Sequence, residues 1–271
     1  MSQMLSTLHD VHGLTHAGPV RAVNEDAIAW WQDTHLPLTC AILADGMGGH
    51  QGGALASQLA VDAVEDTLRE AARHWRRDMP PSRESRTHLL EMAARAGNAA
   101  ICLGRTHQPG VEKMGTTLVV ALIWQQEITL LHAGDSRAYL FHAESGPLEQ
   151  LTRDDSVVQA MLDEGAIRAE DIPNIPYRNV LTNALGIQDT LHCTTTQLTA
   201  RPGDVLLLCS DGLHDVVSAD DIRHQFSQSM GARADAEALM QLSLRRRTPD
   251  NSSLIVVRLN ESGPRAPETD I

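Results

Sequence analysis

The chain reads Ala41-Ile42-Leu43-Ala44-Asp45-Gly46-Met47-Gly48-Gly49 where its first long apolar run ends. An apolar run that stops at an aspartate is typical of a buried strand that carries a carboxylate to the edge of a sheet. The glycines that follow allow the backbone to approach another group closely. An Asp-Gly pair after a strand is also a common turn, so this stretch alone leaves both interpretations open.

Three further aspartates lie at the boundaries of apolar runs. Asp211 ends the run Val205 to Cys209 after a single serine and precedes Gly212, whereas Asp135 and Asp250 each precede a run. Strand ends at one edge of a sheet can converge, and converging carboxylates raise one another's pKa unless cations neutralise them. Oxygen ligands of this kind suit Mg²⁺ or Mn²⁺ and not zinc. Four unrelated turn aspartates would give the same spacing.

The remaining pattern predicts an α+β domain, because antiparallel strands and helix pairs are segregated along the chain. Strand-like runs occupy 27–31, 38–44, 118–124, 128–132, 138–141, 148–151, 205–209 and 253–259. Helical periodicity occupies 53–75, 85–103, 157–164, 219–227 and 234–244. The tight turns between the strands of 118–151 predict one antiparallel meander.

We predict a single domain over residues 11–260, preceded by a tail at 1–10 and followed by a disordered tail at 261–271. The segment 152–190 is polar and carries only one short helix, so it predicts an insertion, here called the flap, that lies over the sheet. Insertions of this length are often functional.

The overall charge argues against two classes of partner. The net charge is −13, from 22 Lys and Arg against 35 Asp and Glu, whereas nucleic acids and anionic membranes attract basic surfaces. No segment approaches the roughly 20 apolar residues of a membrane span, and the first residues do not read as a signal peptide. These features favour a cytoplasmic protein without nucleic-acid or membrane partners.

Histidine and cysteine patterns do not predict a site. His9, His12 and His16 have helical ligand spacing, but glycines at 13 and 18 argue against a continuous helix there. The four cysteines form no CxxC pair, and Cys40 and Cys209 lie inside apolar runs. They are expected to be buried thiols in a reduced compartment.

Six short motifs occur in an order that resembles the metal-dependent protein phosphatases of the protein phosphatase 2C family, in its bacterial form with the catalytic domain alone. They are Arg21-x-x-Asn24-Glu25-Asp26, Asp45-Gly46-Met47-Gly48-Gly49, Gly115-Thr116-Thr117, Gly134-Asp135-Ser136-Arg137, Asp211-Gly212-Leu213 and Asp250-Asn251. The resemblance covers residues 11 to 258. It implies a four-layer α-β-β-α sandwich, in which two antiparallel sheets are flanked by helix pairs.

The resemblance also implies roles for individual residues. Asp45 would bridge two Mg²⁺ or Mn²⁺ ions, with the Gly46 carbonyl on one ion and Asp211 and Asp250 on the other. A third, weaker metal position would use Asp135 together with Asp211. Glu25 and Asp26 would act mainly through water, and Arg21 would bind the substrate phosphate with its planar guanidinium.

The implied reaction is hydrolysis of phosphoserine and phosphothreonine on proteins, in opposition to a bacterial Ser/Thr kinase. Two ions about 4 Å apart lower the pKa of a bridging water, and the resulting hydroxide attacks phosphorus in line. The partners implied are phosphorylated proteins and a cognate kinase, and the enzyme is expected to be a monomer.

The sequence departs from the family pattern at four places. Met47 follows the Asp-Gly pair where some members have histidine, and the flap reads Asp154-Asp155-Ser156 where Asp-His-Ser is frequent. Ile175 replaces a histidine before proline, and Asn183 replaces a frequent arginine. These changes leave the implied metal ligands intact and concern the contacts of the flap.

Two other function classes are weaker. A catalytically silent phosphoprotein-binding module on the same fold is expected to have lost one of Asp45, Asp211 and Asp250, and all three are present. A nucleotide-binding loop at 46–53 lacks Gly-Lys-Ser/Thr, and Gln51 stands where a GxGxxG motif starting at Gly46 needs glycine.

Overall fold

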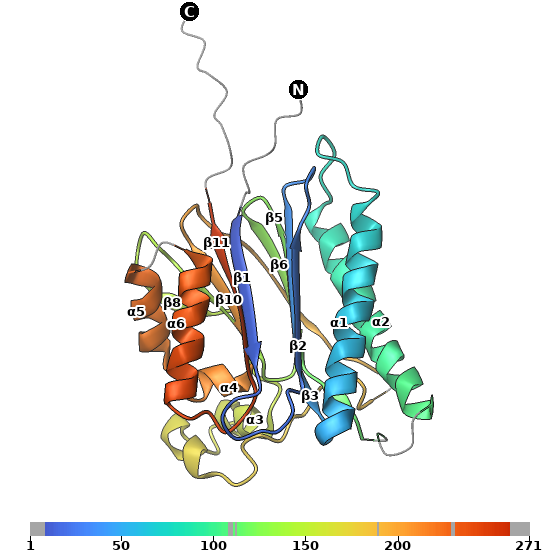
Figure 1. Cartoon of the computed structure of the whole chain (residues 1–271). Coiled ribbons are helices and arrows are strands. Elements are labelled where there is room, and N and C mark those ends of the chain that lie inside the picture. The colour runs from blue at the N-terminus through green and yellow to red at the C-terminus, as the bar shows by residue number, and fades with distance from the viewer. Residues whose placement is uncertain (1–8, 108–110, 112, 189, 229–230, 261–271) are drawn as a thin grey trace, which may run out of the picture.

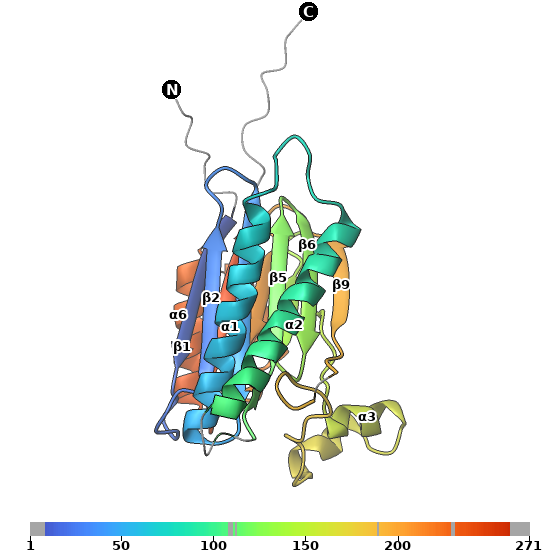
Figure 2. The same ribbon diagram turned by 90° about the vertical axis from the view of Figure 1, so that its right-hand side faces the viewer.

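A computed structural model of the chain describes residues 9–107, 111, 113–188, 190–228 and 231–260. Two antiparallel sheets face each other, and helices cover the outer face of each sheet (Figure 1). The predicted four-layer α-β-β-α sandwich is therefore confirmed. The flap lies at the end of the sandwich where β3 ends, as Figures 1 and 2 show in two views.

The first sheet has the strand order β1-β11-β10-β7-β8. Its strands are β1 (His9–His16), β11 (Ser252–Leu259), β10 (Val205–Cys209), β7 (Arg137–Phe141) and β8 (Leu148–Gln150). His9 pairs with Leu259, so this strand begins two residues before the domain start expected at residue 11. The tail expected at 261–271 lies outside the described residues.

The second sheet has the order β2-β3-β5-β6-β9. Its strands are β2 (Asp26–Gln32), β3 (Leu38–Met47), β5 (Leu118–Trp124), β6 (Glu127–Ala133) and β9 (Thr194–Thr199), and β4 (Gly115–Thr116) pairs with the end of β3. Residues Cys40 and Ile42 pack under the helices, whereas Ala41 and Leu43 pack between the sheets. Burial on both faces explains why the run before Asp45 is apolar at every position.

The helices segregate by sheet. Figure 2 shows α1 (His50–Ala72) and α2 (Arg83–His107) across the outer face of the second sheet. The first sheet is covered by α5 (Ala219–Gln228), α6 (Ala232–Arg245) and the short α4 (Asp211–His214). The flap contains α3 (Val157–Asp163) and the 3₁₀ helix η1 (Ala169–Asn174).

The prediction of one meander over 118–151 is wrong. Strand β6 pairs with β5 and β9, whereas β7 pairs with β10 and β8, so the turn at 134–136 crosses from one sheet to the other. Gly134 adopts a φ of 105°, and a Cβ there would lie 2.7 Å from the Thr117 side chain. The crossover carries Asp135 to the edge where both sheets end.

Strand β9 was not expected from the sequence, because only one of its residues, Leu198, is apolar. Its β-branched threonines favour a strand, and it lies at the edge of the second sheet. Cys40 and Cys209 are buried free thiols as expected. His9 and His12 lie on opposite faces of β1, so the three N-terminal histidines do not share one face.

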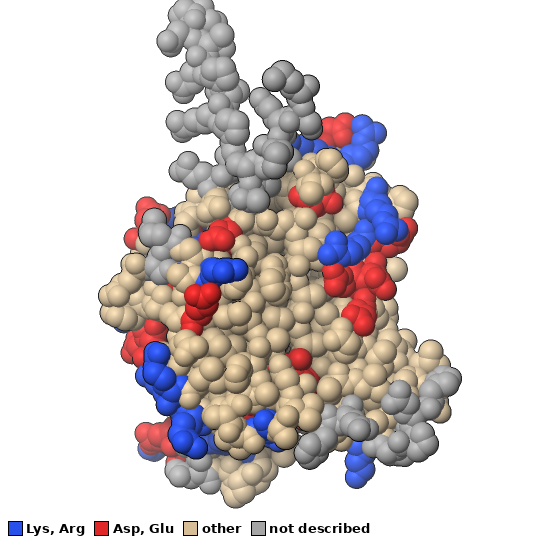
Figure 3. All heavy atoms as spheres, in the orientation of Figure 1, with Lys and Arg blue, Asp and Glu red and all other residues tan. Residues whose placement is uncertain are grey.

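Charged side chains of both signs are intermixed on the face seen in Figure 3, without a continuous basic stripe. No helix in the described part of the chain is long and apolar enough to cross a bilayer.

Candidate active site

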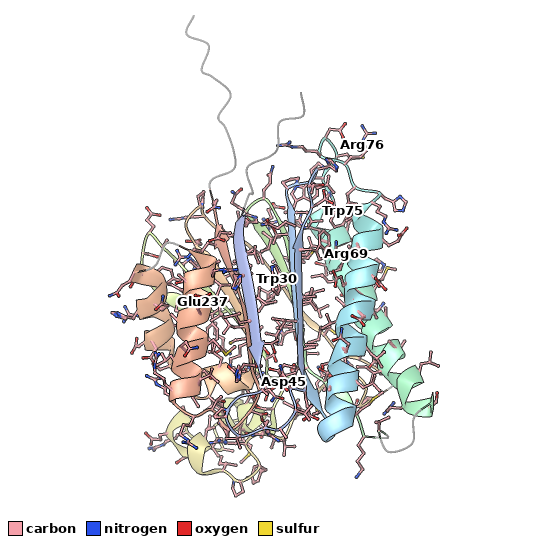
Figure 4. All side chains as sticks on the ribbon, viewed as in Figure 1. Trp30, Asp45, Arg69, Trp75, Arg76 and Glu237 are labelled. Carbon is pink, nitrogen blue, oxygen red and sulfur yellow. The ribbon has the colours of Figure 1, made fainter. Side chains whose placement is uncertain are left out.

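A cavity of about 470 Å³ lies at the end of the two sheets beneath the flap. Figure 4 shows Asp45 at this end of the strands, far from Trp75 and Arg76 beyond the other end of α1. Of the predicted site residues, seven line the cavity: Arg21, Glu25, Asp45, Gly46, Asp135, Asp211 and Asp250. The structure thus brings together residues from five separate segments of the chain.

The end of β3 is fixed by the paired threonines that precede β5. The Asp45 amide donates to Thr117 Oγ1 at 3.0 Å, and the Thr117 amide donates to the Asp45 carbonyl at 2.9 Å. Thr116 Oγ1 also donates to that carbonyl, at 2.8 Å. Three hydrogen bonds therefore satisfy the main chain of Asp45, and its side chain is left for the cavity.

Gly46 occupies a position that excludes any side chain. Its amide donates to the Glu25 carbonyl at 3.1 Å, and a Cβ would clash with the carbonyl oxygens of Glu25 and Gly53. Gly46 and Gly53 therefore allow close backbone approach between β3, the residues before β2 and the start of α1.

Asp211 and Asp250 come from the first sheet. Asp211 begins α4 and is separated from β10 by Ser210 alone, and Asp250 precedes β11. Asn251 accepts a hydrogen bond from the Glu25 amide at 2.8 Å and donates to the carbonyl oxygens of Ala17 and Val23. This side chain ties the segment that carries Arg21 and Glu25 to the aspartate at the start of β11.

The carboxylates form one electrostatic cluster. Burial raises the pKa of Asp45 well above its usual value, and the charges of Asp26, Asp211 and Asp135 raise it further. Burial also raises the pKa of Asp211 well above its usual value, with added effects from Asp135 and Asp250. For Asp135, burial is again the main cause and raises the pKa to about 6. A cation would offset this repulsion.

The donor set fits a hard divalent cation. It consists of carboxylates and a backbone carbonyl, and Asp211 Oδ1 is buried with no hydrogen-bond partner among the described residues. No group of three or more His, Cys, Asp and Glu side chains within those residues is arranged to enclose an ion by itself. Mg²⁺ prefers oxygen ligands such as these and keeps several waters in its coordination sphere.

Arg21 lies at the mouth of the cavity. Its Nη2 donates to Asp250 Oδ2 at 2.6 Å, and half of its side chain is exposed. The guanidinium is therefore within reach both of a predicted metal ligand and of a ligand that enters from solvent.

Asp26 lies behind the cavity and does not line it. It pairs with Asp45 across β2 and β3, and its Oδ2 accepts hydrogen bonds from Ser210 Oγ at 3.0 Å and Ser253 Oγ at 2.6 Å. Burial raises its pKa to about 6. Its predicted action through water stays a prediction.

Sequence reasoning assigned no role to four supporting residues, namely Thr117, Ser210, Asn251 and Ser253. Thr117 and Asn251 were part of the quoted motifs, and Ser210 directly precedes an Asp-Gly pair. A polar residue next to a motif aspartate at a strand end is the signal that could have identified Ser210 and Asn251. Thr117 lies in the Gly115-Thr116-Thr117 motif instead. Ser253 carries no such signal, because it lies inside a strand.

A family model described as protein phosphatase 2C matches residues 16–246. The chain belongs to the protein phosphatase 2C family. The serine/threonine protein phosphatase PstP of Mycobacterium tuberculosis is 38% identical over 239 residues, which cover 88% of this chain and 43% of that protein. The chain thus spans less than half the length of this phosphatase 2C relative.

Two further comparisons cover most of the matched protein or solved chain. The serine/threonine phosphatase stp of Listeria monocytogenes is 33% identical over 224 residues, covering 82% of this chain and 85% of that protein. The solved catalytic domain of PstP in complex with two manganese ions superposes with a TM-score of 0.78 at 35% identity. That match covers 93% of this chain and 99% of the solved chain.

Proposed function

We propose that this chain is a metal-dependent protein phosphatase that hydrolyses phosphoserine and phosphothreonine on proteins. The observation that carries the proposal is the convergence of Asp45, Asp211 and Asp250 on one cavity whose mouth holds Arg21. A cluster of carboxylates is a poor anion site by itself, so phosphate binding there requires cations.

The negatively charged side chains and the Gly46 carbonyl would bind the metal ions and their waters. Asp45, Asp211, Asp250 and the Gly46 carbonyl would hold two Mg²⁺ or Mn²⁺ ions, which supply an activated water near neutral pH and offset charge on the phosphoryl group. Asp135 with Asp211 would hold a third ion. Glu25, which lines the cavity, and Asp26 would orient water around the ions.

Arg21 would bind two oxygens of the phosphoryl group through its planar guanidinium. This contact orients the phosphorus and offsets the charge that develops on its oxygens. The proposed reaction does not use a cysteine nucleophile. Burial raises the pKa of both Cys193 and Cys209 to about 12, so these thiols stay protonated.

A silent phosphoprotein-binding module is disfavoured, because the predicted direct metal ligands are present and line the cavity, namely Asp45, Gly46, Asp135, Asp211 and Asp250. The partners we propose are phosphorylated proteins and a Ser/Thr kinase that generates them. We also propose that the chain acts as a monomer. The presence of PstP with two manganese ions among its relatives supports Mn²⁺ as the first metal to test.

The test is hydrolysis of a phosphothreonine peptide with Mn²⁺, with and without EDTA, by the wild type and the Asp211→Asn variant. We expect turnover that EDTA abolishes and that the variant lacks. Turnover without metal, or an unaffected variant, would refute the proposal. Circular dichroism checks that Asp211→Asn is folded.

A further inference from the structure

Beside the Arg137–Asp154 ion pair, Asp155 attaches the flap to the crossover turn through its amide and its side chain. Its amide donates to the Gly134 carbonyl at 2.9 Å, and its Oδ2 accepts from the Gly134 amide at 3.0 Å. Both polar groups of one glycine are thus held by one residue. That glycine directly precedes Asp135, whose side chain lines the cavity.

The same carboxylate also holds the wall that the flap contributes to the cavity. Asn183 Nδ2 donates to Asp155 Oδ2 at 2.8 Å, and the Thr182 amide donates to the Asp155 carbonyl at 2.8 Å. Both Thr182 and Asn183 line the cavity. Asp155 and Asn183 are two of the positions at which the chain departs from the family pattern, and here they are hydrogen-bonded to each other.

A second attachment holds the far end of this wall. The amides and carbonyls of Thr116 and Leu185 are joined by two hydrogen bonds, at 3.1 and 2.9 Å. These main-chain bonds involve Thr116, which also donates to the Asp45 carbonyl, and they do not reach Gly134. Asp155 is hydrogen-bonded to both and therefore links the flap wall directly to the turn that carries Asp135.

We propose that Asp155 is a positioning residue that joins the flap wall at 182–183 to the turn carrying Asp135, so that the flap and the third metal position adopt their working geometry together. The part of this proposal that concerns metal rests on the proposed function of the site. The part that concerns the attachment rests on the hydrogen bonds alone.

The geometry allows the role of Asp155 as a hydrogen-bond acceptor to be tested separately from the role of its negative charge. Gly134 and Asn183 donate to the same oxygen, Oδ2, so the single amide oxygen of an Asp155→Asn variant can accept both bonds. Asp155→Ala removes the acceptor altogether. Glu164→Ala, which removes an exposed flap carboxylate at the end of α3, is the matched control.

The first measurement is amide hydrogen exchange in metal-free protein. Loss of a hydrogen bond to a charged acceptor is expected to speed exchange at Gly134 on the order of tenfold in Asp155→Ala. Asp155→Asn and Glu164→Ala are expected to exchange within about twofold of the wild type at this amide. Wild-type exchange at Gly134 in Asp155→Ala would overturn the attachment.

The second measurement is the Mn²⁺ concentration that gives half-maximal hydrolysis of p-nitrophenyl phosphate. We expect it to rise on the order of tenfold in Asp155→Ala and to return toward the wild-type value in Asp155→Asn. Equal impairment of both variants would show that the charge matters and would overturn the positioning role. If the wild type hydrolyses nothing, the proposed function fails, whereas the exchange experiment still decides the attachment.

Discussion

Arg21 and Asp250, which are 229 residues apart in the chain, are joined by a 2.6 Å hydrogen bond between Nη2 and Oδ2. The residue proposed to bind phosphate is thereby paired with a residue proposed to bind metal. A metal ion and the guanidinium compete for the same carboxylate, since both are cations. Metal binding at Asp250 is therefore expected to release the guanidinium for the substrate.

This competition predicts that Arg21→Ala weakens the binding of a phosphopeptide and strengthens the binding of Mn²⁺. The KM for a phosphopeptide rises by about 10- to 100-fold because charge-assisted hydrogen bonds are lost. Mn²⁺ binding, measured by calorimetry, becomes tighter because Asp250 no longer has a cationic partner. Arg201→Ala, which removes an arginine paired with Glu144, is the control and is expected to change neither value.

Asp45→Asn is expected to separate stability from activity. The raised pKa of Asp45 means that the folded, metal-free protein binds this proton more tightly than the unfolded chain. Folding at neutral pH must therefore either bury this charge or take up a proton, and a neutral amide removes that cost. We expect a higher Tm in EDTA, by about 2–4 °C for each kcal/mol gained, and a fall in kcat on the order of 10³-fold.

Differential scanning calorimetry with and without Mn²⁺ checks this prediction. The wild type should gain stability on adding Mn²⁺, because the ions bind the folded state, and Asp45→Asn should gain much less. A variant that is less stable than the wild type in EDTA would contradict the electrostatic account.

The raised pKa of Asp26 predicts how the stability of the metal-free protein changes with pH. This pKa is raised from 3.8 to about 6, so the contribution of Asp26 to stability is complete below about pH 3.8 and is lost as pH rises through about 6. The urea midpoint in EDTA should therefore decline over this interval, and less steeply in Asp26→Asn. Asp62→Asn, at an exposed position on α1, should show the wild-type slope. Equal slopes in all three proteins would contradict this assignment.

Gly46→Ala tests the need for close backbone approach. The added Cβ would meet two backbone carbonyls, which cannot rotate away, and the loss of stability should reach about 3 kcal/mol or more. Gly231→Ala is the comparison, because the nearest atom to its added Cβ is 3.8 Å away. Urea unfolding measures both, and similar midpoints for the two variants would contradict the packing argument.

The layer architecture could be predicted from the sequence, because strands that are buried on both faces, such as β3, form continuous apolar runs. The connection after β6 could not, since the turn at 134–136 has the same local chemistry whether the next strand joins the same sheet or the other one. Only the long-range pairing of β7 with β10 decides it. Strand β9 was missed because an edge strand of threonines resembles a polar loop.

The aspartates of the site could be identified from their positions at strand ends, yet their environments could not. Both Asp26 and Asp45 lie at one end of an apolar run, so the sequence does not distinguish their environments. Asp26 accepts hydrogen bonds from two serine hydroxyls behind the cavity, whereas Asp45 lines the cavity. The serines come from β11 and the residue after β10, so no local pattern reveals the contact. The Asp155–Asn183 pair was hidden for the same reason.

The most direct test of the central claim is anomalous diffraction from crystals soaked in Mn²⁺. We predict two strong peaks that share Asp45 as a ligand, one also at the Gly46 carbonyl and the other also at Asp211 and Asp250. Peaks elsewhere with none at Asp45, or a lone ion without Asp45 as a ligand, would contradict the account.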